Sequence, residues 1–136
     1  GKEKELTVID SAERVVTVKK PVKKVVVLGR DLITAMKIIK ATDKLVAIDT
    51  ATASDEVFFP ELSKLPAVGT IQSPDHEAIL THNPDVVISY AVCKRWGDML
   101  EEKLPDSITV VRLDFTSPLK MTSDTKKTWI YLRQKE

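Results

Sequence analysis

Residues 24–29 read Lys-Val-Val-Val-Leu-Gly, a continuous apolar run rich in β-branched residues. Such a run indicates a strand that is covered on both faces, as in a parallel sheet. The period then changes, and apolar residues recur at the spacing of one helix face at Leu32, Ala35, Met36 and Ile39. We expect Asp31 to cap this helix and the helix to end near Ala41. A buried strand followed directly by a helix predicts an α/β fold.

The same alternation continues along the chain. Further buried strands are predicted over 44–49, 86–90 and 108–114, and further helices over 73–81, 96–103 and from Thr122 onwards. Ser73-Pro74 is expected to open the first of these helices, and the residues from Thr50 to Ser54 are expected to form a polar loop. Right-handed crossovers then build a Rossmann-like parallel sheet with helices on both faces. Ahead of it, two β-prone runs predict an N-terminal β-hairpin, Leu6 to Asp10 and Arg14 to Val18.

Length and composition favour one compact domain. The chain has 136 residues, of which 43% are apolar and 30% charged, and its net charge is +1. No block of like charge suggests nucleic acid or an anionic membrane as a partner. The N-terminal residues lack the apolar core of a signal peptide, so we expect either a cytosolic protein or one whose leader has been removed.

Common catalytic motifs are absent from the sequence. It contains no G-x-G-x-x-G, Walker lysine, G-x-S-x-G or H-E-x-x-H pattern, so a nucleotide-dependent enzyme is not expected. His76 and His82 are six residues apart, which places them on different helix faces and makes two exposed surface histidines the better interpretation. Cys93 is the only cysteine, and no nearby histidine could activate it, so we expect a half-buried structural residue. The sequence therefore predicts neither an enzyme nor a metal or cofactor site.

The carboxyl ends of the predicted strands form the expected ligand edge. Tyr90, Arg95 and Trp96 cluster after one strand and could hold a large planar or anionic ligand, although Trp96 could instead cover the core beside Leu100. Arg30 follows another strand and could contact ligand, or could pair with Asp31 or Asp49. The loop over 69–73 is expected on the same edge.

Several motifs, taken together and in order, resemble a known family. They are the hairpin over 7–18, Pro21 with the strand over 22–28, Gly69-Thr70, Glu77-Ala78-Ile79 and Asn83-Pro84-Asp85-Val86-Val87-Ile88. From about Leu6 to Thr125 the chain is similar to the periplasmic binding proteins for iron-siderophores, haem and cobalamin. The usual D-x-x-G-R turn of that family has Glu13 in place of glycine here, which could alter the turn.

The resemblance implies two α/β lobes joined by a long helix, with the ligand in the cleft between them. This chain would supply only the N-terminal lobe, residues 1–121, and the start of the connecting helix, residues 122–136. Expected ligand contacts from this lobe are Arg30, Thr50, Tyr90, Arg95 and Trp96. Glu77 matches the position of the glutamate that docks on the permease of an ABC importer, which implies an extracytoplasmic location and a small-molecule ligand such as an iron-siderophore or corrinoid.

The C-terminal end departs from the family pattern. Residues 128–134 read Thr-Trp-Ile-Tyr-Leu-Arg-Gln, where the family's connecting helix usually continues with a run such as Leu-Gly-Tyr-Ile-Leu-Gly-Lys. Codons for the usual run, read with one extra base ahead of them, can encode the observed run. This indicates a frameshifted, truncated gene product.

Two other hypotheses remain open on the sequence. A truncated lobe could self-associate through its uncovered cleft face and have no transport role. A receiver-like signalling domain has a similar length, but it would need an acidic pair at the end of the first strand, where this chain has Gly29-Arg30.

Overall fold

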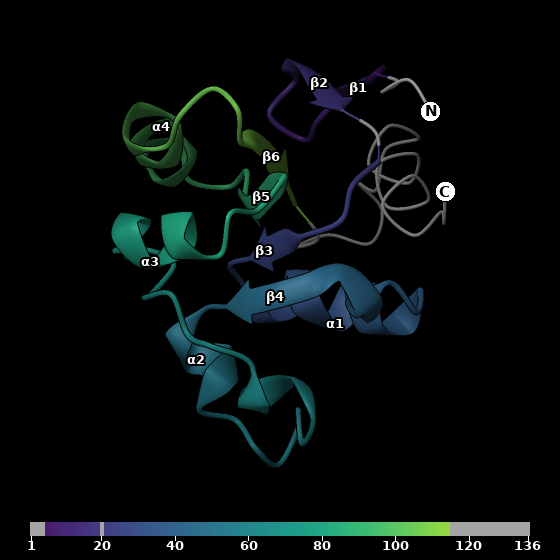
Figure 1. Cartoon of the computed structure of the whole chain (residues 1–136), viewed down its shortest axis with the longest axis vertical. Helices are drawn as coiled ribbons and strands as arrows, with labels where there is room; N and C mark the ends of the chain where they lie inside the picture. The colour runs from purple at the N-terminus through teal and green to yellow at the C-terminus, as the bar shows by residue number, and fades with distance from the viewer. Residues whose placement is uncertain (1–4, 20, 115–136) are drawn as a thin grey trace.

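A parallel β-sheet forms the centre of the chain (Figure 1). The computed structural model describes residues 5–19 and 21–114. Within them, β4 (Leu45–Ile48), β3 (Val25–Val27), β5 (Val86–Tyr90) and β6 (Thr109–Leu113) pair side by side in that order, all parallel. The three valines of β3 and all of β5 are buried, because helices cover both faces of the sheet.

The helices divide between the two faces. Helix α1 (Arg30–Ile38) packs Leu32, Ile33 and Met36 into one apolar cluster. Helices α3 (His76–Thr81) and α4 (Lys94–Lys103) pack Ile79 and Leu100 into the other. Short helical turns lie at Thr42–Lys44, Thr50–Ala53 (α2) and Leu62–Lys64. The predicted fold class, a Rossmann-like parallel sheet with flanking helices and an N-terminal hairpin, is confirmed.

The hairpin of β1 (Glu5–Ile9) and β2 (Val15–Lys19) forms a separate antiparallel sheet beside β6. Its turn completes the hydrogen bonding of β6. The carboxylate of Asp10 accepts the backbone N–H of Arg112 at 3.1 Å, and the N–H of Ser11 donates to the carbonyl of Arg112 at 2.9 Å. The guanidinium of Arg14 donates to the Val110 carbonyl at 3.1 Å. An otherwise open strand edge, which could pair with another chain, is thereby covered.

Glu13 occupies a turn position that favours glycine. Its φ is 61°, in the left-handed region, and its N–H donates to the carbonyl of Asp10 at 3.0 Å. The turn nevertheless closes, because Asp10 accepts the backbone N–H groups of Ala12 and Arg14 through one carboxylate oxygen. The replacement of glycine by Glu13 therefore preserves the turn at the cost of a strained backbone.

Three local predictions were wrong. Thr50–Ala53 is one helical turn rather than a loop, because the side chain of Asp49 caps it. Asp31 does not cap α1, which begins at Arg30 after Gly29 without a side-chain cap. Helix α3 begins at His76, capped by Asp75, and not at Ser73-Pro74. In two of the three cases a side chain that was not assigned as a cap from sequence, Asp49 or Asp75, caps the helix.

No helix within residues 5–19 and 21–114 is long and apolar enough to cross a membrane. The predicted lobe boundary after 121, the helix from Thr122 and the altered run over 128–134 lie outside the described residues.

Candidate functional site

The loops at the carboxyl ends of β3 and β4 are joined by one buried carboxylate. Asp49 accepts the backbone N–H of Gly29 at 3.0 Å, the N–H of Thr52 at 3.2 Å and the hydroxyl of Thr52 at 2.7 Å. The N–H of Thr50 donates to the carbonyl of Gly69 at 2.8 Å, which brings in the next loop. These three loops form one edge, and residues 91–96 follow β5, which pairs parallel to β3 and so ends at the same edge. We call this edge the strand-end rim: residues 29–31, 49–54, 69–73 and 91–96.

Arg30 lies on the rim with an exposed side chain. Its guanidinium pairs with Asp55 at 2.6 Å and lies 4.8 Å from the centre of the Phe58 ring. The partner is therefore neither Asp31 nor Asp49, the two acids that the sequence suggested. The pair fixes the guanidinium beside α2 while leaving about half of the side chain open to solvent.

Tyr90 serves the fold as well as the rim. The residue is only 9% exposed, and its hydroxyl accepts the backbone N–H of Asp31 at 3.0 Å. Burial raises the pKa of Tyr90 to about 12. Gly29, with φ of 143°, lies so close that a Cβ there would be 2.5 Å from the tyrosine ring. Tyr90 thus links β5 to the start of α1, and its ring is largely committed to packing.

Arg95 and Trp96 lie in the first turn of α4, which begins after Cys93. Arg95 is exposed, whereas Trp96 is half-buried and packs against the apolar cluster that contains Tyr90. Thr50 is exposed at the start of α2. The structure therefore brings the predicted ligand residues to one edge, with Arg30, Thr50 and Arg95 open to solvent and the two aromatic side chains partly used by the core.

A hollow of about 470 Å³ borders the rim where β5 leads into α4. Its walls are Ala12, Arg14, Ala91, Lys94, Asp98 and Arg112. Arg112 is 3% exposed and donates to Asp98 at 2.8 Å. A hydrogen bond from Lys94, at 2.5 Å, and then the bond from Arg112 lower the pKa of Asp98. The cations of this hollow are thus already paired with acids.

Sequence reasoning missed Arg112 because it lies within a strand that reads as buried. The signal that could have indicated it is Gly97, one of only four glycines in the chain. A Cβ on Gly97 would lie 2.1 Å from Nε of Arg112, so glycine leaves the room that this buried side chain needs in order to reach α4.

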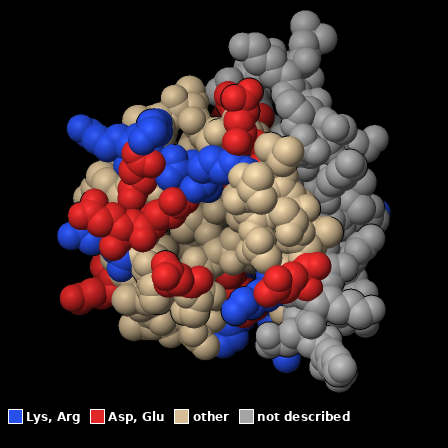
Figure 2. Space-filling view, turned by 90° about the horizontal axis from the view of Figure 1, so that it is seen from above, with Lys and Arg blue, Asp and Glu red and all other residues tan. Residues whose placement is uncertain are grey.

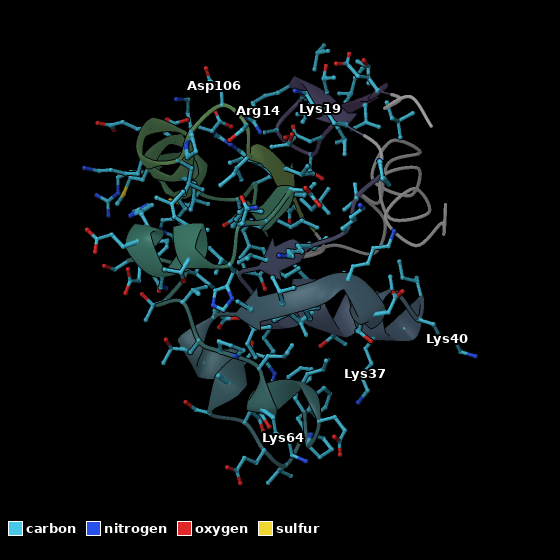
Figure 3. All side chains as sticks on the ribbon, viewed as in Figure 1. Arg14, Lys19, Lys37, Lys40, Lys64 and Asp106 are labelled. Carbon is cyan, nitrogen blue, oxygen red and sulfur yellow. The ribbon has the colours of Figure 1, made fainter. Side chains whose placement is uncertain are left out.

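A second hollow, of about 270 Å³, lies between β2, the end of α4 and the start of β6. Arg14 and Asp106 are among its lining residues, and both lie on the hairpin side of the molecule in Figure 3. Figure 2 shows the molecule from that side, where acidic and basic side chains border an uncharged depression. Because Ile108 and Thr109 line it before and at the start of β6, this hollow is not part of the strand-end rim.

The two histidines and the cysteine do not form a site together. Among the described residues no group of three or more His, Cys, Asp or Glu could hold a metal ion. Cys93 is a free, half-buried cysteine. The prediction of two exposed histidines was wrong, because His76 and His82 are both half-buried and Nε2 of His76 is inaccessible to solvent and has no hydrogen-bond partner. Glu77, by contrast, is exposed in the first turn of α3.

No protein-family model and no curated protein matches the chain at a significant level. Solved structures do match it. The periplasmic catecholate-siderophore-binding protein VctP of Vibrio cholerae is 18% identical, with a TM-score of 0.70 over 95% of this chain and 44% of its own. The petrobactin-binding protein YclQ of Bacillus subtilis is 17% identical, with a TM-score of 0.72 over 92% and 44%. The molybdate-binding protein MolA of Haemophilus influenzae is 24% identical, with a TM-score of 0.64 over 79% and 34%.

These matches establish the fold. The chain has the architecture of one part of two-lobed periplasmic binding proteins, and it spans less than half the length of each of the three. At this level of identity, the likeness concerns the fold rather than the ligand.

Proposed function

We propose that this chain is the N-terminal, ligand-binding lobe of an extracytoplasmic substrate-binding protein that serves an ABC importer. The observation that carries the proposal is the match of nearly the whole chain to part of such proteins, among them VctP over 95% of its residues. The continuous strand-end rim supports it, because ligands of open α/β sheets bind at that edge. A binding role, rather than an enzymatic one, agrees with the character of the matched proteins.

The rim favours an anionic ligand with a large flat surface. Arg95 offers an exposed side chain, and Arg30 a guanidinium that is paired with Asp55 on a half-exposed side chain. Guanidinium groups form strong hydrogen bonds to carboxylate or phenolate oxygens. Trp96 adds a half-buried aromatic surface, Thr50 a hydroxyl, and Tyr90 supports the loop that carries Arg30. An iron-siderophore complex fits this combination best, and a corrinoid or haem-like ligand fits it second.

Glu77 is proposed as the permease contact of this lobe. Its side chain is exposed on α3, a helix that does not contribute to the rim residues defined above. Docking there would leave the ligand edge free for a second lobe. An acidic residue on such a surface suits a basic partner, and its removal should reduce docking without changing ligand affinity.

The ligand class is tested by calorimetric titration of the chain with an iron(III)–siderophore complex, a corrinoid, haem and molybdate. One lobe supplies only part of the contacts while the entropic cost of association remains, so we expect micromolar or weaker binding. The proposal is supported if titration with the siderophore complex gives saturable heats of binding and injection of metal-free buffer alone gives none. Absence of binding by all four ligands at millimolar concentration contradicts it.

A second candidate function is a lobe that self-associates and has no transport role. One observation favours it: Val92 is 60% exposed on the rim, two residues after the end of β5, where an apolar side chain would be covered by a partner. Multi-angle light scattering over a range of concentrations separates the two candidates. A dimer that dissociates when Val92 is replaced by Asp supports self-association, and a monomer at high concentration excludes it.

A further inference from the structure

The imidazole of His76 is placed where a second proton has no acceptor. The residue begins α3, and its Nε2 atom has essentially no solvent contact and no hydrogen-bond partner. A neutral ring tolerates this position when Nε2 is the unprotonated nitrogen, because an unused lone pair costs less than an unpaired charged donor. The imidazolium form would place a charged N–H in the same enclosed position.

Two charged groups act on the ring, from two elements. Lys103 of α4 disfavours the charged ring, and Asp75, which caps α3, favours it. Burial has a larger effect than either and, together with Lys103, lowers the pKa of His76 below its ordinary value of 6.5. The carboxylate of Asp75 also accepts the N–H of Ala78 at 3.0 Å, so one of its two oxygens holds the helix cap.

Helix α3 is weakly anchored. It has six residues, and Ile79 is its only buried one. A helix this short does not persist without tertiary packing. Its contact with the cluster around Leu100, made through Ile79, must therefore hold it in place.

We propose that α3 is an acid-sensitive element of the lobe, released from α4 and the sheet when His76 takes up a second proton. In the released state the imidazolium of His76 is hydrated, so its Nε2–H group donates to water instead of being buried without an acceptor. The proposal concerns the lobe itself and does not depend on the proposed transport function. If Glu77 docks on a permease as proposed, its helix would become less ordered in acid and docking would weaken.

Amide hydrogen exchange of the full chain at pH 7.5 and pH 5 tests the inference. Protection factors are compared, so that the effect of pH on the intrinsic exchange rates cancels. Both pH values lie about one unit or more from the ordinary histidine pKa of 6.5. We expect protection in α3 to fall several-fold in acid, up to a limit of about thirtyfold at pH 5, because the released state binds the proton more tightly than the folded state. Protection in α1, on the opposite face of the sheet, should stay constant. Nuclear magnetic resonance titration of the two histidine rings assigns the proton uptake.

Two variants and one control decide the outcome. His76→Gln and His76→Leu both remove the titrating ring, and the leucine keeps an apolar side chain in the site if glutamine destabilises the helix. Both should abolish the acid-induced loss in α3, whereas His82→Gln at the end of the same helix should retain it. Loss of α3 protection in both His76 variants as in the wild type overturns the inference. So does constant protection in the wild type.

Discussion

The carboxylate of Asp49 accepts the backbone N–H of Gly29 at 3.0 Å, across 20 residues of sequence. The bond ties the end of β3 to the end of β4 at the point where both strands turn into helices. The same carboxylate caps α2. One buried side chain therefore shapes the part of the rim that carries Arg30 and Thr50, before any ligand is present.

Replacing Asp49 by Ala should destabilise the lobe by about 2–4 kcal/mol. The change removes three hydrogen bonds and leaves the N–H of Gly29 buried without a partner. Urea unfolding followed by circular dichroism measures the loss. Asp43→Ala, on an exposed residue, should change stability by less than about 0.5 kcal/mol. Equal effects of the two substitutions would show that the Asp49 bonds do not hold the rim.

Replacing Glu13 by Gly should stabilise the lobe by about 1 kcal/mol. The residue has φ of 61°, which costs an L-amino acid energy that glycine does not pay. Glu13→Ala is the matched control, because it removes the same side chain but keeps a Cβ in the left-handed conformation. The midpoint temperature of thermal unfolding should rise for the glycine variant and not for the alanine variant. A gain that alanine reproduces would instead indicate that the glutamate side chain was unfavourable.

Replacing Gly97 by Ala should destabilise the lobe by about 1–3 kcal/mol, although alanine in a helix normally stabilises. The new Cβ would lie 2.1 Å from Nε of Arg112, within a closely packed contact of α4 with β6. The comparison is a double-mutant cycle with Arg112→Ala, which removes the colliding side chain. In that background the same substitution should be neutral or stabilising. If Gly97→Ala destabilises the Arg112→Ala variant as much as it does the wild type, the Cβ does not collide with Arg112.

Tyr90 should ionise only at strongly alkaline pH. Burial raises its pKa from 10.0 to about 12, and in the folded state its hydroxyl accepts the N–H of Asp31. Because the folded pKa is the higher one, the stabilising effect is complete below pH 10 and is lost as the pH rises through 12. Ultraviolet absorbance of a Tyr131→Phe variant isolates this residue, since the chain has two tyrosines. Ionisation at the ordinary pKa would contradict the buried position.

The strands were predictable from sequence because burial on both faces leaves a clear apolar signal, as at 25–27 and 86–90. Helix starts were less predictable, because several residues near each start could serve as the cap. The side chain of Asp75, and not that of Ser73, caps α3. The side chain of Asp49, which precedes the expected loop, caps α2. Local patterns indicate which residues can cap, whereas the tertiary arrangement decides which one does.

The site was only partly predictable for a related reason. The strand-end rule predicted that Arg30, Thr50 and Arg95 lie at one edge, since that rule depends on topology alone, and their role as ligand contacts stays a prediction. It could not show that Arg30 pairs with Asp55, 25 residues away, or that Arg112 lies under Gly97. These contacts depend on how loops and helices meet in three dimensions, and no periodic pattern records them.

The most direct test of the central claim is a fluorescence titration of Trp96 with an iron(III)–siderophore complex. It is carried out in a Trp129→Phe background, because the chain has two tryptophans. Arg95→Ala is preferred to removal of Trp96, whose ring also packs on the core. The account predicts saturable quenching, an affinity that falls by about 1–3 kcal/mol in Arg95→Ala, and an unchanged affinity in Glu77→Ala. Loss of binding in Glu77→Ala with normal binding in Arg95→Ala would contradict the placement of the ligand on the strand-end rim.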